Sequence, residues 1–190
     1  MKPPKSKKLI LKAAKKMFFQ SGLNKITVEE ICTESSVSKM TFYRNFKNKE
    51  EIARSILESV FKESNIQYKS IMDQEIPFAK KVEQIILMDK NYADQISSEF
   101  VNDLLSYKTD VFIELINKNN EVMDLQLEKD FLTAQKNGEL RKETPVAFYI
   151  HMLKDIRNKI KDPNLKSLYK EDKDMWIDLT YFYFYGILSK

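Results

Sequence analysis

Hydroxyl-bearing and basic side chains gather in one short stretch near residue 40. Ser38, Lys39 and Thr41 begin this stretch, and Tyr43 and Arg44 follow within two helical turns. Hydroxyl, ammonium and guanidinium groups donate hydrogen bonds to phosphate oxygens, and several of these residue types also contact base edges. Side chains of these types on one short helix indicate a surface that binds double-stranded DNA.

Two short helices joined by a tight turn are predicted to position these side chains. Thr27 with Glu30 three residues later forms a capping box that opens the first helix, and Ser36 lies in the turn. Ser38 caps the second helix, which ends near Arg44. In a helix-turn-helix the second helix enters the major groove, and its early residues meet base edges. Those early residues are Ser38, Lys39, Met40 and Thr41.

Helical patterns flank this motif on both sides. Residues 6–21 carry Ile10 and Phe18 on one apolar stripe, and Gly22 is a typical helix end. Asn48 opens a long fourth helix. The predicted DNA-binding part is therefore a three-helix domain over residues 1–50, which the fourth helix joins to the rest of the chain.

The remaining chain, residues 51–190, is also predicted to be helical, so the expected fold class is all-α. Only 3 glycines and 5 prolines interrupt it. One expected helix starts at Pro77. Four further helices are expected to span about 95–106, 109–137, 144–161 and 171–188. The aromatic run 181–185 has local β character. It is assigned to the last helix because Trp176, Leu179, Tyr183 and Ile187 continue one apolar stripe.

Charge separates the two parts. Residues 1–54 hold 13 Lys or Arg and 5 Asp or Glu, which gives a net charge of +8, whereas residues 55–190 have a net charge of −4. A basic head on an acidic body favours polyanion binding by the head. The alternative is that the charged residues only form solvent-exposed helix faces and bind no partner.

Catalytic and metal-binding chemistry has little to build on. The chain has one cysteine, Cys32, and one histidine, His151, so a cofactor, metal site or enzymatic function is not expected. It shows no secretory signal and no apolar run of about 20 residues, the length that spans a bilayer. A cytoplasmic location is expected by default.

Residues 10–54 resemble the DNA-binding domain of TetR-type (tetracycline-repressor-like) transcriptional regulators. The fixed points of the resemblance include Ala13, Ala14, Phe18, Gly22, Thr27, Val28, Ile31, Val37, Ser38, Thr41, Tyr43, Phe46, Lys49 and Glu50. The resemblance implies that Tyr43 and Lys49 hold the DNA backbone. It also marks two departures, because Ser36 and Met40 stand where the family usually has glycine.

The resemblance further implies a ligand pocket in the body of the protein. The candidate pocket residues are Tyr107, Phe112, Tyr149, His151 and Asp155. For each of them the alternative is an ordinary place in the core or on the surface. A bound small-molecule effector that favours a wider spacing of the DNA-binding heads would lower operator affinity.

Useful specificity requires two helix-turn-helix motifs on one DNA face, which a homodimer on a palindromic operator supplies. The last two long helices are the predicted dimer surface. The resulting interpretation is a dimeric, ligand-responsive repressor that contacts DNA through Thr27, Ser38, Lys39, Met40, Thr41, Tyr43, Arg44 and Lys49. Open alternatives are a ligand-independent activator, a nucleoid-type DNA binder, and a basic membrane-surface or partner-binding helical protein.

Overall fold

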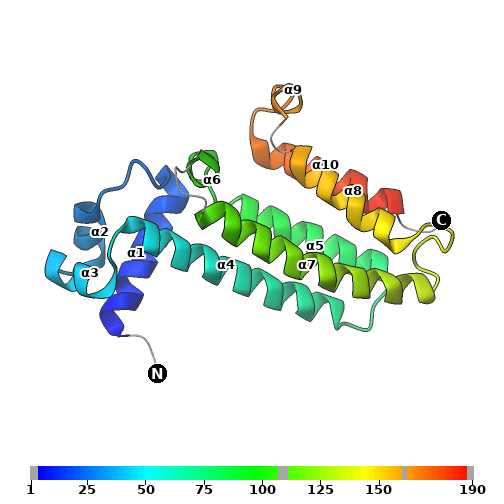
Figure 1. The fold of residues 1–190 in the computed structure, drawn as a ribbon, viewed down its shortest axis with the longest axis horizontal. Helices are drawn as coiled ribbons and strands as arrows, with labels where there is room; N and C mark the ends of the chain where they lie inside the picture. The colour runs from blue at the N-terminus through cyan, green and yellow to red at the C-terminus, as the bar shows by residue number, and fades with distance from the viewer. Residues whose placement is uncertain (1–3, 107–110, 160–161, 188–190) are drawn as a thin grey trace. The chain divides into compact units, whose positions relative to one another are not determined.

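The computed structural model describes residues 4–106, 111–159 and 162–187, and no β-strand occurs among them (Figure 1). The all-α prediction is confirmed. The helices are α1 (Lys5–Ser21), α2 (Val28–Ser35), α3 (Lys39–Asn45), α4 (Lys49–Met72), α5 (Phe78–Ala93), α6 (Ser98–Ser106), α7 (Val111–Lys136), α8 (Val146–Lys159), α9 (Pro163–Lys166) and α10 (Asp172–Ile187).

Helix ends follow the capping signals closely. The Thr27 hydroxyl accepts a hydrogen bond from the Glu30 amide, and the Glu30 carboxylate accepts one from the Thr27 amide, which completes the predicted capping box. The short α9 was not predicted. Its N-cap is Asp162, and Pro163 fills its first position, so these two residues start a single helical turn.

The chain folds into two compact units, each with its own apolar core. The first contains residues 1–64 and 95–116, and the second contains residues 65–94 and 117–190. The predicted boundary at residue 50 separates a DNA-binding part from a regulatory part, and this functional division stays a prediction. The two packing units divide the chain at other residues. In particular, α6 belongs to the unit that holds the helix-turn-helix.

In the first unit α1 is the central helix, and α2, α3 and α6 contact it (Figure 1). Phe18 is fully buried and stacks with Phe100 of α6, with ring centroids 6.3 Å apart. The Ser97 amide, just before α6, donates a 2.8 Å hydrogen bond to the Phe19 carbonyl at the end of α1. The first unit therefore includes a helix that lies far along the sequence.

In the second unit α10 contacts α5 and α8. Tyr183, Phe184 and Ile187 of α10 lie in its core, and Trp176 and Leu179 pack against it. The aromatic run 181–185 is helical as predicted, and the expected apolar stripe faces inward. Tyr181, Phe182 and Tyr185 of the same run remain exposed.

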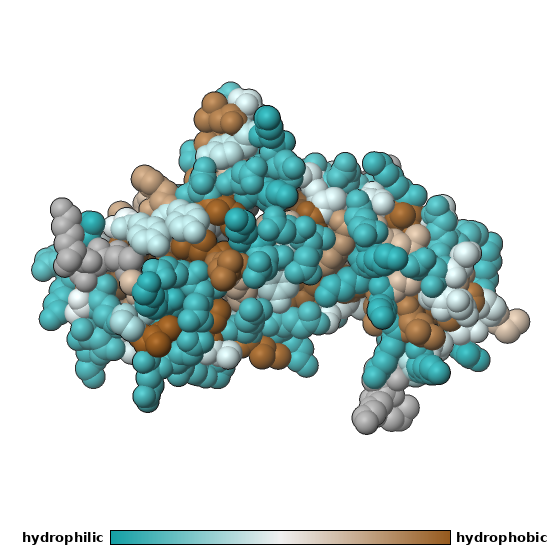
Figure 2. Space-filling view, turned by 180° about the vertical axis from the view of Figure 1, so that it is seen from behind, coloured by the Kyte–Doolittle hydropathy of each residue, from teal (hydrophilic) through white to brown (hydrophobic). Residues whose placement is uncertain are grey.

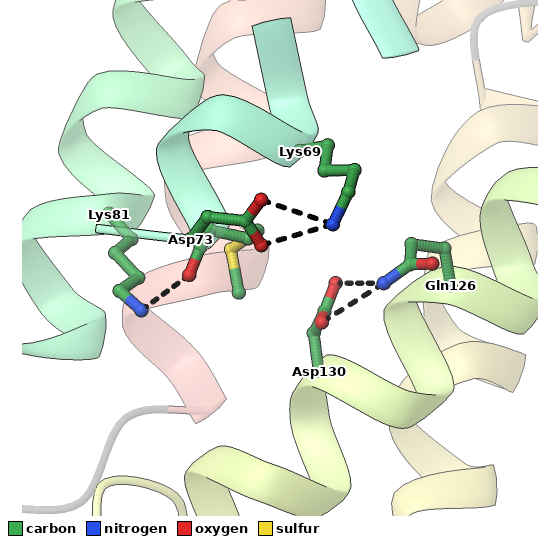
Figure 3. Close-up of polar contacts among 6 residues, drawn as sticks. Lys69, Asp73, Lys81, Gln126 and Asp130 are labelled. Carbon is green, nitrogen blue, oxygen red and sulfur yellow. Dashed lines mark hydrogen bonds and ion pairs between the residues drawn. The ribbon is translucent and has the colours of Figure 1, made fainter. Parts of the chain in front are cut away.

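Polar contacts close the connection between α4 and α5 (Figure 3). The Lys81 ammonium donates a 2.7 Å hydrogen bond to the Met72 carbonyl at the end of α4, and Lys69 pairs with Asp73. On α7, the Gln126 amide donates to both oxygens of Asp130 at 3.1 Å. These polar side chains therefore find their hydrogen-bond or ion-pair partners within the second unit.

Asp89 of α5 is a half-buried carboxyl in the second unit. Burial raises its pKa to about 7, although the nearby positive charge of Arg157 opposes the increase. Arg157 itself donates a 2.6 Å hydrogen bond to Asp124. No hydrogen bond reaches the Asp89 carboxyl from the part of the chain that the structure describes. Ionisation of Asp89 is therefore costly in the folded state.

Asp89→Asn should stabilise the protein at pH 8 and have little effect at pH 4. The unfolded carboxyl titrates near 3.9, so the folded state loses stability as the pH rises from about 4 to about 7. Asparagine removes that loss, which is at most about 4 kcal/mol and is expected to be about 2 kcal/mol because solvent reaches the side chain. Urea unfolding at fixed protein concentration would measure it. Equal destabilisation at both pH values would contradict the prediction.

Candidate DNA-binding surface

The turn between α2 and α3 fixes the recognition helix. Ser36 adopts a left-handed conformation, with φ 53° and ψ 41°, and its amide donates to the Cys32 and Thr33 carbonyls. Serine bears the strain that glycine would avoid at this position. Phe42 of α3 is fully buried in the core of the first unit, so α3 presents its opposite face to solvent.

Besides Lys39, three side chains of α3 are exposed and available to DNA. Met40 is 82% exposed and Tyr43 is 56% exposed. The Tyr43 ring packs edge-on against Phe42 at 5.3 Å, and its hydroxyl makes no hydrogen bond to the described residues. Arg44 is exposed and likewise has no ion-pair partner within the described ranges. Together they offer an apolar contact, a neutral donor and a cation.

Other predicted DNA-contacting residues are engaged in holding the motif. The Ser38 hydroxyl accepts from the Thr41 amide at 3.1 Å and donates to the Thr41 hydroxyl at 3.0 Å. The Thr27 amide and hydroxyl both donate to Glu30 at 2.8 Å. Ser38, Thr41 and Thr27 would have to share or exchange these bonds in order to contact DNA.

Lys49 has its ammonium fully occupied. Its Nζ donates to the carbonyl oxygens of Leu23, Asn24 and Ile26 at 2.9, 3.2 and 3.1 Å, which uses all three of its hydrogens. Lys49 thereby fastens the loop between α1 and α2 to the start of α4. The predicted contact of Lys49 with phosphate stays a prediction, and it would require this clamp to open at least in part.

Asp103 of α6 holds the same loop from another side. Its two carboxylate oxygens accept hydrogen bonds from the Asn24 amide and side chain at 2.9 and 2.6 Å. Sequence reasoning missed Asp103, because 79 residues separate the partners and helical periodicity carries no signal for such a contact. The sequence also gave no indication that Lys39 pairs with Glu29, since the two lie on different helices.

The candidate ligand residues lie in different surroundings, and their role in a pocket stays a prediction. Phe112 is buried in the core of the first unit, and Tyr149 is buried in the core of the second. His151 and Asp155 are exposed neighbours on α8, with 3.6 Å between His151 Nε2 and Asp155 Oδ2. Tyr107 lies outside the described residues.

The chain is similar to known transcriptional regulators. Residues 10–56 match the family model described as bacterial regulatory proteins, tetR family. An uncharacterized HTH-type transcriptional regulator of Bacillus subtilis strain 168, YhgD, is 27% identical over 150 residues, 78% of each chain. The chain belongs to the TetR family of transcriptional regulators.

Solved structures share the fold of this TetR-family chain over nearly its whole length. A putative fatty acid metabolism regulator of Clostridium perfringens is 25% identical, covering 96% of this chain and 100% of its own, with a TM-score of 0.61. SmeT, the repressor of the Stenotrophomonas maltophilia multidrug efflux pump SmeDEF, is 16% identical with a TM-score of 0.68, covering 97% and 91%.

Among the residues that the structure describes, no helix combines the length and apolar character needed to cross a membrane. The same residues contain no group of three or more His, Cys, Asp or Glu side chains that could hold a metal ion.

Tyr43→Phe should weaken DNA binding by this TetR-family regulator about tenfold for operator and random DNA alike, because a hydrogen bond to a charged phosphate is lost. Phenylalanine keeps the ring contact with Phe42, so thermal stability should not change. Fluorescence anisotropy with both duplexes measures the effect. Unchanged affinity at physiological salt would show that the hydroxyl does not contact the backbone.

Proposed function

We propose that this TetR-family regulator is a cytoplasmic homodimeric repressor that binds a palindromic operator and leaves it when a small molecule binds. The observation that carries the proposal is the exposed face of α3, where Met40, Tyr43 and Arg44 are available for DNA. The basic N-terminal charge supports the same role, because Lys and Arg near the motif attract the DNA backbone.

Dimer formation through α8 and α10 has its support in exposed aromatic side chains. Phe182 of α10 is 80% exposed, and Tyr181 and Tyr185 of the same helix are 44% and 50% exposed. Phe148 of α8 is 51% exposed. Figure 2 shows apolar side chains, in brown, at the surface among polar ones. Exposed apolar patches of this kind are typical of protein interfaces. Two copies packed through these helices would form a four-helix bundle.

The small-molecule part of the proposal has two kinds of support. SmeT is the repressor of a multidrug efflux pump, and the Clostridium perfringens protein is a putative fatty acid metabolism regulator. Within the second unit, Asp89 and the Arg157–Asp124 pair provide polar groups next to an apolar core. An effector with an apolar body and a few polar atoms fits these surroundings.

Selection of bound fragments from the host genome tests the proposed function. The expected result is a palindrome whose half-sites are one helical turn of DNA, about 34 Å, or a multiple of it apart. Two protomers should bind each site, and genes beside the site would suggest effectors for release assays. Enrichment without any sequence preference would instead identify a nucleoid-type DNA binder.

A further inference from the structure

An ion pair joins the two helices of the helix-turn-helix. The Lys39 ammonium, at the first position of α3, pairs with the Glu29 carboxylate in the first turn of α2. The Lys39 hydrogen bond lowers the pKa of Glu29, and the same bond raises the pKa of Lys39. Both side chains are more than half exposed, so the pair can exchange partners with a ligand in solvent.

The pair changes what α3 offers to DNA. α3 carries two cationic side chains, Lys39 and Arg44. Arg44 has no ion-pair partner among the residues that the structure describes, whereas the charge of Lys39 is balanced by Glu29. A lysine that is already neutralised releases fewer counterions when DNA approaches, so it adds less to non-specific affinity.

We propose that Glu29 is a specificity-determining residue that holds Lys39 away from phosphates and releases it only to a base edge of the correct operator. The proposal rests on the proposed function, since it requires α3 to bind DNA in the major groove. It assigns a role to a residue of α2 that itself need not contact any base.

The relative sizes of the interactions support selective release. An exposed ion pair contributes about 0–1 kcal/mol, and a single phosphate contact at physiological salt offers Lys39 no clear gain over Glu29. A well-placed contact with guanine discriminates by about 1–3 kcal/mol, which exceeds the pair. On random DNA Lys39 therefore stays with Glu29, and on the operator it changes partner.

Glu29→Gln tests the proposal in the full-length protein. Affinity for a random-sequence duplex should rise roughly three- to tenfold at physiological salt, and the slope of log affinity against log salt should steepen by about 0.9 per protomer. Operator affinity should change less, so the ratio of operator to random binding falls. Unchanged random-DNA affinity and salt slope would overturn the proposal.

Glu34→Gln is the matched control. Glu34 also lies on α2 and pairs with a lysine, Lys16, at 2.9 Å, but Lys16 belongs to α1. This variant loses the same charge from the same helix and should leave the specificity ratio as in the wild type. An equal fall in the ratio for Glu34→Gln would mean that Glu29 acts only through net charge, which overturns the proposal.

A double-mutant cycle separates release of Lys39 from simple repulsion of DNA by Glu29. In a Lys39→Gln background, Glu29→Gln should no longer raise random-DNA affinity, because no lysine is left to release. A rise of the same size in that background would overturn the proposal. Failure of the wild type to prefer any selected site over random DNA is a different result, and it would overturn the proposed function itself.

Discussion

Phe182→Glu is expected to convert the protein into a monomer and to lower operator affinity at least a hundredfold. Phe182 is the most exposed aromatic side chain of α10. In a dimer packed through α10, a carboxylate at this position would be buried without a partner. Two-fold symmetry would place this free-energy cost on both subunits. Each additional 1.4 kcal/mol reduces affinity tenfold, and a monomer carries a single helix-turn-helix. Light scattering with size-exclusion chromatography and operator anisotropy measure the two effects.

Leu125→Glu provides the control for Phe182→Glu. Leu125 lies on α7 and is 63% exposed, so the same charge is introduced at an exposed apolar position outside α8 and α10. It should leave both assembly and operator affinity unchanged. A dimeric Phe182→Glu variant would place the interface elsewhere, and a monomer with full affinity would refute the need for two motifs.

Gly22→Ala is expected to destabilise the protein by about 3 kcal/mol, because backbone strain and a steric clash act together. Gly22 follows α1 with φ 84° and ψ 165°, a region that essentially only glycine adopts. A Cβ atom there would lie 2.7 Å from an Asp103 carboxylate oxygen and 3.2 Å from Glu99 Cβ. Moving Asp103 would also break its bonds to Asn24. Chemical denaturation measures the loss.

Gly138→Ala separates the two causes. Gly138 also has a positive φ, +81°, but a Cβ atom added there meets nothing within 4 Å. This variant should lose only about 1 kcal/mol from backbone strain. Gly22→Ala should lose more than Gly138→Ala, because its added Cβ meets Asp103 in addition to straining the backbone. If Gly22→Ala were no more destabilising than Gly138→Ala, the close approach of α6 would have no energetic weight.

Local signals predicted the helices well because capping and periodicity act over a few residues. Thr27 and Glu30 lie three residues apart, and their capping box forms as expected. The single turn α9 was missed because four residues are too few to show a period. Its signal was the Asp162–Pro163 pair, which is typical of a helix start as well as of a break.

The helix that carries the candidate DNA-binding residues was predicted, whereas the hydrogen bonds among those residues were not, and their contacts with DNA stay a prediction. The residue types of α3 indicated a DNA-binding helix, yet the sequence could not show that Ser38 and Thr41 bond to each other. Partners such as Glu29 for Lys39, or three carbonyl groups for Lys49, come together only in the folded chain. Phe112 and Tyr149 are buried in the two cores, and a role in a ligand pocket stays a prediction for both.

The double hold on the loop after α1 has a consequence for building chimeric regulators. Lys49 fastens this loop from α4 and Asp103 fastens it from α6, while Phe100 covers Phe18 and Phe19. A head cut at residue 50 and grafted onto another body would lose the α6 contacts and expose those rings. An exchangeable cassette should therefore carry residues 95–116 with the head, so its smallest form is discontinuous in sequence.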